Sequence, residues 1–212
     1  MTRLLVVTAV AAEADAVRAG ADPGRVVVTP VGVGPAVAAA GTARLLAAGT
    51  PFRAVVSAGI AGGFPGRAVV GATVLGIRSI AADLGAETPD GFVPIEDLGF
   101  GTSVLAADAG LLAILTAALP VAVRGDILTL STVTGTAGTA TRLAHRFPAA
   151  VAEAMEGYGV ASAAALARVP FAELRTISNP IGPRDRTAWR LPDALAALTK
   201  AAAAISAPAL WV

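Results

Sequence analysis

The sequence predicts a layered α/β domain. Short runs rich in β-branched residues alternate with Ala- and Leu-rich windows along the chain, which is typical of strands that alternate with helices. Hydrophobic residues make up 55% of the 212 residues and charged residues only 15%, so we expect strands that are buried on both faces. The chain has no internal repeat and no linker, and its length indicates a single domain over residues 1–212.

Proline and glycine delimit the expected elements of the first half. Pro35 suits the first turn of a helix and Gly49 suits its exit, while Val-, Ile- and Leu-rich runs predict the strands. In chain order the sequence predicts a strand over 4–8, a helix over 11–18, a strand over 25–29, a helix over 35–48, a strand over 54–57 and a strand over 69–77.

The second half of the chain begins with a segment of different amino-acid composition. Residues 80–102 combine acidic residues with Gly and Pro, and we expect a long loop there, of the kind that tends to be functional in a compact domain. The remaining signals predict a helix over 111–119, a strand over 125–131, a Thr- and Gly-rich passage over 131–141, a long Ala-rich helix over 149–168, a strand over 171–178, a polar loop over 179–190 and a final helix over 191–205.

The composition excludes several classes of function. The formal net charge is +1 with no basic run, which does not favour a nucleic-acid partner. The absence of Cys excludes disulfides, thiol catalysis and Cys-ligated zinc. The one histidine, His145, argues against a His-built metal site or a Ser-His-Asp triad, and we expect it to cap a helix or lie on the surface. Any chemistry then rests on carboxylates, amides, arginines and backbone groups.

The N-terminal segment 1–12 superficially resembles a short signal peptide, with one early Arg and an apolar run. A buried first strand fits the α/β pattern better. The longest uncharged apolar stretches are broken by Gly and Pro or are too short to span a bilayer. We therefore expect a cytoplasmic protein with no membrane partner.

Three glycine-rich turns follow expected strands, at 32–34, 58–63 and 134–138. Glycines after a strand let backbone amides approach a ligand, and ligands in open α/β sheets bind at the carboxyl ends of strands. None of the three matches a dinucleotide fingerprint or a P-loop. Each is also compatible with a plain tight turn, but together they point to one shared pocket.

Two glutamates stand in small apolar surroundings. Glu13 comes just after the first strand, and Glu156 lies inside the expected helix 149–168 beside Met155, Tyr158 and two glycines. A buried carboxylate is costly unless it has a partner or a role, so both are candidate functional groups. Glu153, by contrast, is expected on an exposed face of that helix.

Asn179 directly follows the strand 171–178, where a short amide can both donate and accept hydrogen bonds. It also fits a turn residue before Pro180. Arg184 and Arg186 flank Asp185 in the next loop. Their guanidinium groups suit a carboxylate or phosphate ligand, and they suit equally an ion-pair network with Asp185.

Four of these stretches together resemble the nucleoside phosphorylase superfamily, and most closely its nucleosidase branch. They are Glu13, the segment 57–63, Ala154-Met155-Glu156-Gly157 and Ile177-Ser178-Asn179, in an order and spacing that agree from residue 3 to about residue 205. Within that branch, segments 82–92, 132–139 and 178–186 look like the futalosine hydrolase family. The resemblance implies a three-layer α/β/α domain with a central mixed, twisted sheet.

The resemblance also implies the reaction and the roles. The N-ribosidic bond of futalosine would be hydrolysed to hypoxanthine and dehypoxanthine futalosine, a step of menaquinone biosynthesis, with no metal or organic cofactor. Glu13 would deprotonate the attacking water, while Glu156 would hold the ribose hydroxyls and stabilise the cationic sugar. Further substrate contacts carried over in this way are Met155 against Glu156, Val33 and Ile60 on the sugar side, and Val133 and Thr134 at the base.

Asn179 departs from the pattern of the adenine-releasing relatives, which have Asp at this position. An ionised Asp would face the O6 carbonyl of hypoxanthine acceptor to acceptor, whereas an amide can donate to O6 or N7. Asn179 therefore favours a 6-oxopurine, although it is a weaker acid, and Asp185 is one candidate proton donor to the base. Futalosine also ends in a benzoate-like carboxylate, which Arg184 or Arg186 could bind.

Three other functions remain open at this point. A phosphorylase needs a cationic site near the sugar, and the turn 58–63 has no Arg. An adenine-releasing nucleosidase acting on methylthioadenosine or aminodeoxyfutalosine is disfavoured by Asn179. A nucleoside-binding sensor would not need Glu13 and Glu156. The resemblance further implies a homodimer or higher homo-oligomer, with residues 92–102 as the segment that closes a neighbour's pocket.

Overall fold

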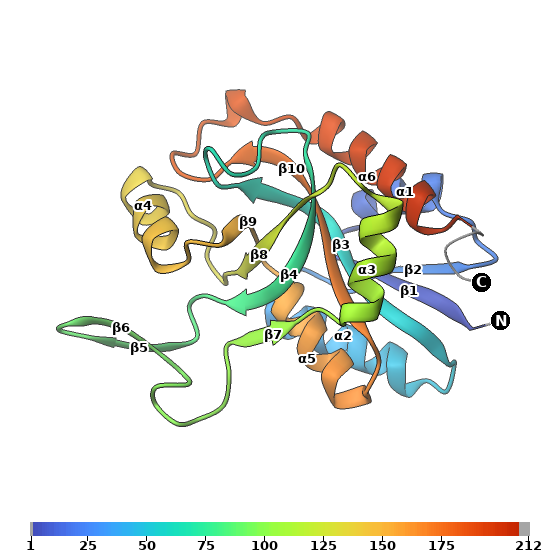
Figure 1. Cartoon of the computed structure of the whole chain (residues 1–212), viewed down its shortest axis with the longest axis horizontal. Coiled ribbons are helices and arrows are strands. Elements are labelled where there is room, and N and C mark those ends of the chain that lie inside the picture. Colours follow the sequence, from blue (N-terminus) through green and yellow to red (C-terminus); the bar gives the residue numbers. More distant parts are fainter. Residues whose placement is uncertain (1, 208–212) are drawn as a thin grey trace.

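A computed structural model of the chain describes residues 2–207. Most of its strands form one eight-stranded mixed sheet, and a separate hairpin projects from it (Figure 1). The strands are β1 (Arg3–Thr8), β2 (Val26–Pro30), β3 (Phe52–Gly63), β4 (Thr73–Ala81), β7 (Val104–Ala106), β8 (Val123–Thr129), β9 (Ala150–Ala154) and β10 (Phe171–Pro180), with β5 (Gly85–Thr88) and β6 (Gly91–Pro94) in the hairpin. The helices are α1 (Ala11–Gly20), α2 (Pro35–Ala47), α3 (Ala109–Ala118), α4 (Ala137–Arg146), α5 (Gly157–Ala167) and α6 (Leu191–Ile205).

The sheet has an open part and a part that closes on itself. Strands β2, β1 and β3 are parallel neighbours. Beyond them β3 pairs with both β9 and β10, and the path β3, β10, β4, β8, β9 returns to β3. The long strand β3 therefore connects the open sheet to a closed ring of five strands, and it contributes to both.

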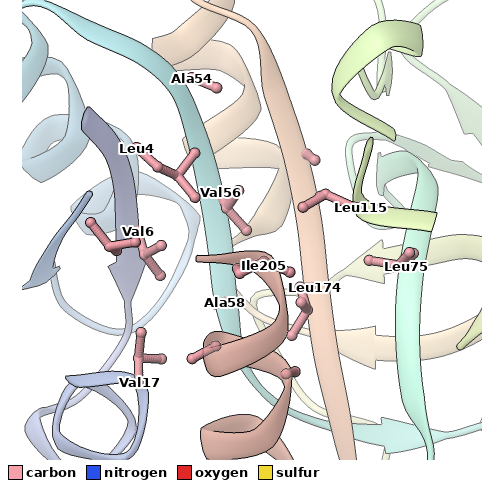
Figure 2. Packing of buried hydrophobic residues seen from close by; sticks show 14 of the residues in the cluster. Leu4, Val6, Val17, Ala54, Val56, Ala58, Leu75, Leu115, Leu174 and Ile205 are labelled. Atoms are coloured by element: carbon pink, nitrogen blue, oxygen red, sulfur yellow. The ribbon is translucent and has the colours of Figure 1, made fainter. Parts of the chain in front are cut away.

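Alternating residues of β1 divide the core into two layers. Leu4 and Val6 pack with helices α1, α3 and α6 on one face (Figure 2). Leu5 and Val7 pack with α2 and α5 on the other. This period of two is the signature of a strand buried on both sides, and it confirms the α/β/α layering expected from the sequence. Within residues 2–207, no helix is both long and apolar enough to cross a membrane.

The expected helix 149–168 is wrong in its first part. Residues 150–154 form strand β9, which is buried throughout between β8 and β3, and the helix begins only at Gly157. Alanine favours a helix locally, but residues 150–154 pair with both β8 and β3, and this tertiary pairing prevails. Glu153 consequently lies on a buried strand and is 5% exposed, not on an exposed helical face.

Other boundaries differ for local reasons. The glycine-rich segment 58–63 continues β3 and is not a turn, because its glycines let neighbouring strands and side chains come close. Strand β4 starts at Thr73, since Gly71 adopts a positive φ of 85° in a preceding turn. The expected loop 80–102 contains the β5–β6 hairpin. Helix α4 emerges from the Thr-rich passage with Thr136 as its cap, and His145 is exposed in its last turn, as expected.

Candidate active site

Glu13 lies in the first turn of α1 and points back to the segment that joins β1 to the helix. One carboxylate oxygen, Oε2, accepts hydrogen bonds from the backbone N–H groups of Ala9 (3.0 Å) and Val10 (3.2 Å). The other, Oε1, accepts from the N–H of Ile60 in β3 (2.9 Å). The side chain is 4% exposed. Three backbone donors from two elements therefore fix the carboxylate in one orientation.

Arg175 joins the other acidic groups of the site. It lies in β10 and is 1% exposed. Its Nη1 donates to Glu156 Oε2 (3.2 Å), its Nε to Glu173 Oε1 (2.9 Å) and its Nη2 to Ser57 Oγ (3.2 Å). The guanidinium group thus has a protein partner in each of its three directions. Glu156, the residue before α5, is held by this arginine.

The first glycine-rich turn also reaches Glu156. The backbone N–H of Gly34 donates to Glu156 Oε1 at 3.3 Å, and Gly34 adopts a positive φ of 89° just before α2. The two oxygens of the Glu156 carboxylate therefore bind groups from two elements, Arg175 of β10 and Gly34 at the start of α2. Val33, on the same turn, is 50% exposed.

Gly59 lets Glu13 and Arg175 approach each other. A Cβ atom at this position would lie 2.5 Å from Glu13 Oε1 and 2.9 Å from Arg175 Nη1, closer than side chains tolerate. Burial alone would lower the pKa of Arg175, but the carboxylates of Glu173, Glu156 and Glu13 raise it overall. The guanidinium group therefore stays charged at the centre of the cluster.

Glu173 is the most deeply buried member of this cluster, with no exposed surface. Ser79 Oγ donates to its Oε2, and its carboxylate fills the space beside Gly157, where a Cβ atom would collide with it. Burial raises the pKa of Glu173, and Arg175 and Ser79 offset only part of this effect. Three carboxylates thus surround one guanidinium group, which gives the cluster a negative charge when all are ionised.

Asn179 lies at the other end of the site, where β10 is irregular. Ile177 pairs with Ala61 and Asn179 with Gly62, so Ser178 is an extra residue on β10. Asn179 Nδ2 donates to the carbonyl oxygen of Pro180 (2.9 Å), and Ser178 Oγ donates to Asn179 Oδ1 (2.8 Å). A carbonyl can only accept, so this contact fixes the amide orientation and leaves one N–H of Nδ2 free.

A cleft lies beside this amide. It is lined by Gly62, Thr134, Glu153, Asn179, Arg184 and Trp189, among others. Thr134 comes from the third glycine-rich passage, and its N–H donates to Glu153 Oε1 at 2.7 Å, while its hydroxyl donates to Oε2. Burial raises the pKa of Glu153, although the Thr134 donors lower it in part. The cleft therefore places an amide and a carboxylate on either side of Gly62.

The comparisons with known proteins identify the family of the chain. The model of the phosphorylase superfamily matches residues 10–210. The futalosine hydrolase of Streptomyces coelicolor is 52% identical over 221 residues, covering 93% of this chain and 92% of that protein. The chain belongs to the phosphorylase superfamily. A second relative within this superfamily, the futalosine hydrolase of Acidothermus cellulolyticus, is 47% identical over 96% of this chain and 90% of that protein.

Solved structures of the superfamily share the fold. The methylthioadenosine/S-adenosylhomocysteine nucleosidase of Colwellia psychrerythraea, in complex with adenine, has a TM-score of 0.83 at 20% identity, covering 97% of this chain and 94% of that chain. The futalosine hydrolase of Helicobacter pylori has the same TM-score at 17% identity, covering 96% and 97%. The superfamily fold, with its mixed sheet and flanking helices, is therefore that of this chain.

Most of the residues predicted from the sequence fall into two groups, one around Arg175 and one at the cleft beside Asn179. Ile60 contributes its N–H to Glu13, Met155 is half-buried and directly precedes Glu156 in the chain, and Val133 and Thr134 line the cleft. Arg184 also lines it, with its guanidinium carbon 5.7 Å from the centre of the Trp189 ring. Arg186 is exposed in a short 3₁₀ helix and is not among the lining residues described.

Asp185 does not suit the role of a proton donor. It is exposed, and its Oδ1 accepts hydrogen bonds from the hydroxyl (2.6 Å) and N–H (2.9 Å) of Thr187. These donors lower the pKa of Asp185, so it does not hold a proton at neutral pH. Its exposure and its contacts with Thr187 therefore do not favour Asp185, which was one candidate, as the proton donor to the base.

Three functional candidates were missed from the sequence: Glu153, Glu173 and Arg175. Glu173 and Arg175 are two residues apart in the otherwise apolar strand 171–178, and such a pair of charges on one face of a buried strand is a usable signal. Glu153 carried no such signal, because its strand was interpreted as a helix.

Proposed function

We propose that this chain is an N-glycosyl hydrolase that cleaves the N-ribosidic bond of futalosine, releasing hypoxanthine and dehypoxanthine futalosine. The observation that carries the proposal is the high identity to futalosine hydrolases over more than nine-tenths of the chain, combined with a site that has a rigidly held carboxylate at one end and an amide at the other. This activity would serve menaquinone biosynthesis.

Glu13 is the proposed general base. Its oxygens are oriented by Ala9, Val10 and Ile60, so a water molecule beside it would meet a fixed acceptor. Removing a proton from the water as it attacks the anomeric carbon is worth about 10²- to 10⁴-fold in rate. The water oxygen bonds to that carbon as the bond to the base nitrogen breaks, and the bonding electrons leave with the purine.

Glu156 is proposed to hold the ribose hydroxyls, with Met155 packed beside it and Val33 and Ile60 on the sugar side. Cleavage develops positive charge on the ribose, and a preorganised anionic environment stabilises that charge. Arg175 holds Glu156 and shares its own charge among three carboxylates, so the cluster stays net negative without losing its geometry.

The same cluster argues against phosphorolysis. An anionic nucleophile would have to approach Glu13 and Glu156, and like charges repel. Arg175, whose guanidinium group is buried beside them, already has a partner for Nε, Nη1 and Nη2. Neutral water is the nucleophile that this site accepts.

Asn179 is proposed to contact the leaving base, with Val133 and Thr134 beside it. Its free Nδ2 hydrogen can donate to O6 or N7 and so stabilise the electrons that move into the ring. Arg184 and Arg186 remain the candidates for the carboxylate at the far end of futalosine. Arg184 lines the cleft, so we expect Arg184→Ala to raise KM more than Arg186→Ala.

We further propose a homodimer or larger homo-oligomer in which residues 92–102 close a neighbour's pocket. Phe100, which follows the β5–β6 hairpin in the sequence, is 79% exposed. The hairpin itself projects from the sheet (Figure 1). Light scattering of the wild type and of Phe100→Ser tests it. We also propose that the enzyme acts in the cytoplasm.

Base release from purified protein tests the activity. Futalosine, inosine, methylthioadenosine and aminodeoxyfutalosine are each incubated with and without phosphate, and the bases are separated by chromatography. Hypoxanthine from futalosine at a rate independent of phosphate is the expected result. Adenine from methylthioadenosine, or release that requires phosphate, would replace the proposal by the corresponding alternative.

A further inference from the structure

We propose that Glu173 is a positioning residue for bond cleavage: it holds Nε of Arg175, so that this arginine gives Glu156 a single hydrogen bond and leaves that carboxylate anionic toward the ribose. The inference rests on the proposed function and deepens it, because it adds to the reaction a residue that has no exposed surface. Glu173 acts through Arg175 and is itself held by Ser79.

The contacts of Arg175 with Glu173 and Glu156 are unequal. Its Nε lies 2.9 Å from Glu173 Oε1, whereas its Nη1 lies 3.2 Å from Glu156 Oε2. Charge-assisted hydrogen bonds between arginine and a carboxylate are usually about 2.7–2.9 Å long, and the two groups frequently pair through two parallel bonds. Arg175 therefore binds Glu173 closely and Glu156 more loosely, although Glu156 is the residue proposed to act on the sugar.

The strand pairing explains why the guanidinium group is not turned toward Glu156. Glu173 and Arg175 are two residues apart on β10 and project to the same face, and Glu173 pairs with Ser57 of β3. Nε is directed along its own strand to Glu173, and Nη2 donates across to Ser57 Oγ at 3.2 Å. With these two nitrogens engaged, Nη1 is the one that donates to Glu156.

Glu173 is fixed in place by its own neighbours. Ser79 Oγ donates to its Oε2, and a Cβ atom on Gly157 would collide with the carboxyl group, so the group fills a fitted space beside the residue that follows Glu156. Oε1 accepts from Nε in both protonation states, because a proton on Oε1 would face the N–H and therefore resides on Oε2, next to the Ser79 hydroxyl. The hold on Arg175 is thus independent of the charge of Glu173.

The division of the arginine between two partners matters because Glu156 is proposed to face a cationic sugar. Its Oε1 accepts from the neutral N–H of Gly34 at 3.3 Å, not from the guanidinium group. If Arg175 turned to pair with both oxygens, the charge that stabilises the developing ribose cation would be largely neutralised. An interaction that strengthens in the transition state affects kcat more than KM. Loss of the hold on Nε should therefore lower kcat.

Two conservative variants separate the reach of the side chain from its charge. Glu173→Gln keeps an oxygen that reaches Nε and removes the charge, whereas Glu173→Asp keeps the charge and withdraws the oxygen by one methylene group. We expect kcat of Glu173→Asp to fall about tenfold or more with KM changed less than about threefold, and Glu173→Gln to retain kcat within about threefold. A loss of kcat in Glu173→Gln that equals or exceeds that in Glu173→Asp overturns the proposal.

The matched control is Asp126→Asn, at another buried carboxylate that binds an arginine. Asp126 lies on β8, is 3% exposed and accepts two hydrogen bonds from Arg78, outside the Arg175 cluster. An amide keeps one of the two acceptor oxygens, so we expect a less stable protein with unchanged kcat and KM. If kcat fell in this control as it does in Glu173→Asp, kcat would follow stability alone and the positioning role would be overturned.

Ser79→Ala provides a second variant in case Glu173→Asp does not fold. It removes the hydroxyl that holds Glu173 Oε2 and leaves every charge of the cluster in place. We expect kcat to fall about threefold or more with KM nearly unchanged. A variant with the kcat of the wild type overturns the proposal.

A crystal structure of Glu173→Asp tests the geometry without turnover. We expect a second guanidinium nitrogen of Arg175 within hydrogen-bond distance of Glu156, and a guanidinium group oriented as in the wild type overturns the proposal. The kinetic variants are compared on the nucleoside that the wild type cleaves in the base-release assay. A wild type that does not cleave futalosine therefore overturns the proposed function, whereas a failure of the positioning role appears only in the variants.

Discussion

Replacing Arg175 by Lys keeps the buried positive charge and removes the fork of N–H donors. The guanidinium group reaches Glu173 through Nε, Glu156 through Nη1 and Ser57 through Nη2. An ammonium group on a flexible stem is a point charge, and it cannot reproduce three contacts that point in different directions in one plane. We expect Lys to retain one of the two carboxylate contacts and to leave the other carboxylate without its donor.

The magnitude follows from the contacts that are lost. Hydrogen bonds to charged groups contribute about 1.5–3 kcal/mol each, and Arg175→Lys loses two donors in a fully buried site, or about 3–6 kcal/mol of unfolding free energy. For a chain of this length, 1 kcal/mol shifts the Tm by about 2–4 °C, so the Tm should fall by roughly 6–24 °C. Solvent does not screen this loss, because Arg175 is 1% exposed.

Urea unfolding followed by circular dichroism measures the effect, and thermal unfolding provides the Tm. The matched control is Arg18→Lys, where the arginine is half exposed and donates to Asp15 and to the carbonyl oxygen of Val28. Exposed pairs of this type contribute about 0.2–1 kcal/mol. If Arg175→Lys destabilised the protein no more than Arg18→Lys, the account of Arg175 as the organising group of the cluster would be refuted.

Three further predictions concern the same cluster. Glu13→Gln should lower the hydrolysis rate about 10²- to 10⁴-fold with an unchanged circular dichroism spectrum, because an amide does not accept the proton of the water; an active variant would exclude Glu13 as the base. Gly59→Ala should displace Glu13 and Arg175 and cost about 1–3 kcal/mol, while Gly138→Ala, whose Cβ meets only Arg142 Nη1 at 3.8 Å, should be tolerated; equal urea midpoints would contradict this. The pKa of Glu173 is raised in the folded state, so the native protein binds this proton more tightly than the unfolded chain, and the associated stability is present below the unfolded pKa and lost as the pH rises through the folded pKa. The unfolding free energy of the wild type minus that of Glu173→Gln should therefore decrease between pH 4.5 and pH 8.5, and a difference that increased would show the opposite shift.

The elements that the sequence predicted well are those in which local and tertiary signals agree. The alternation of Leu4 to Val7 matches a strand with a helical layer on each face, and the observed β1 covers the expected residues. The final helix was expected over 191–205, and α6 has these bounds, with Pro192 in its first turn. In both cases the pattern of apolar residues leaves one conformation that buries them.

The predictions that were wrong involve small residues. Alanine and glycine carry little information about burial, so Ala-rich β9 was interpreted as helix and the glycines of β3 as a turn. What decides their conformation lies elsewhere in the chain. Strand β9 exists because β8 and β3 flank it, and Gly59 is needed because Glu13 and Arg175 meet above it. Strand pairing and close approach of this kind depend on distant parts of the chain, so they cannot be predicted from a window of neighbouring residues.

A single strand serves both ends of the site, and an irregularity makes this possible. In a regular strand Arg175, Ile177 and Asn179 would project to the same face. The extra residue Ser178 shifts the pairing with β3, so Asn179 pairs with Gly62 and turns to the opposite face. Arg175 can then hold Glu156 and Glu173, at the proposed sugar end, while Asn179, held by the hydroxyl of Ser178, lines the cleft at the proposed base end. Because the two groups point to different faces, substitutions at the base end should alter which purine is accepted, whereas substitutions around Arg175 should alter how fast any bond is broken.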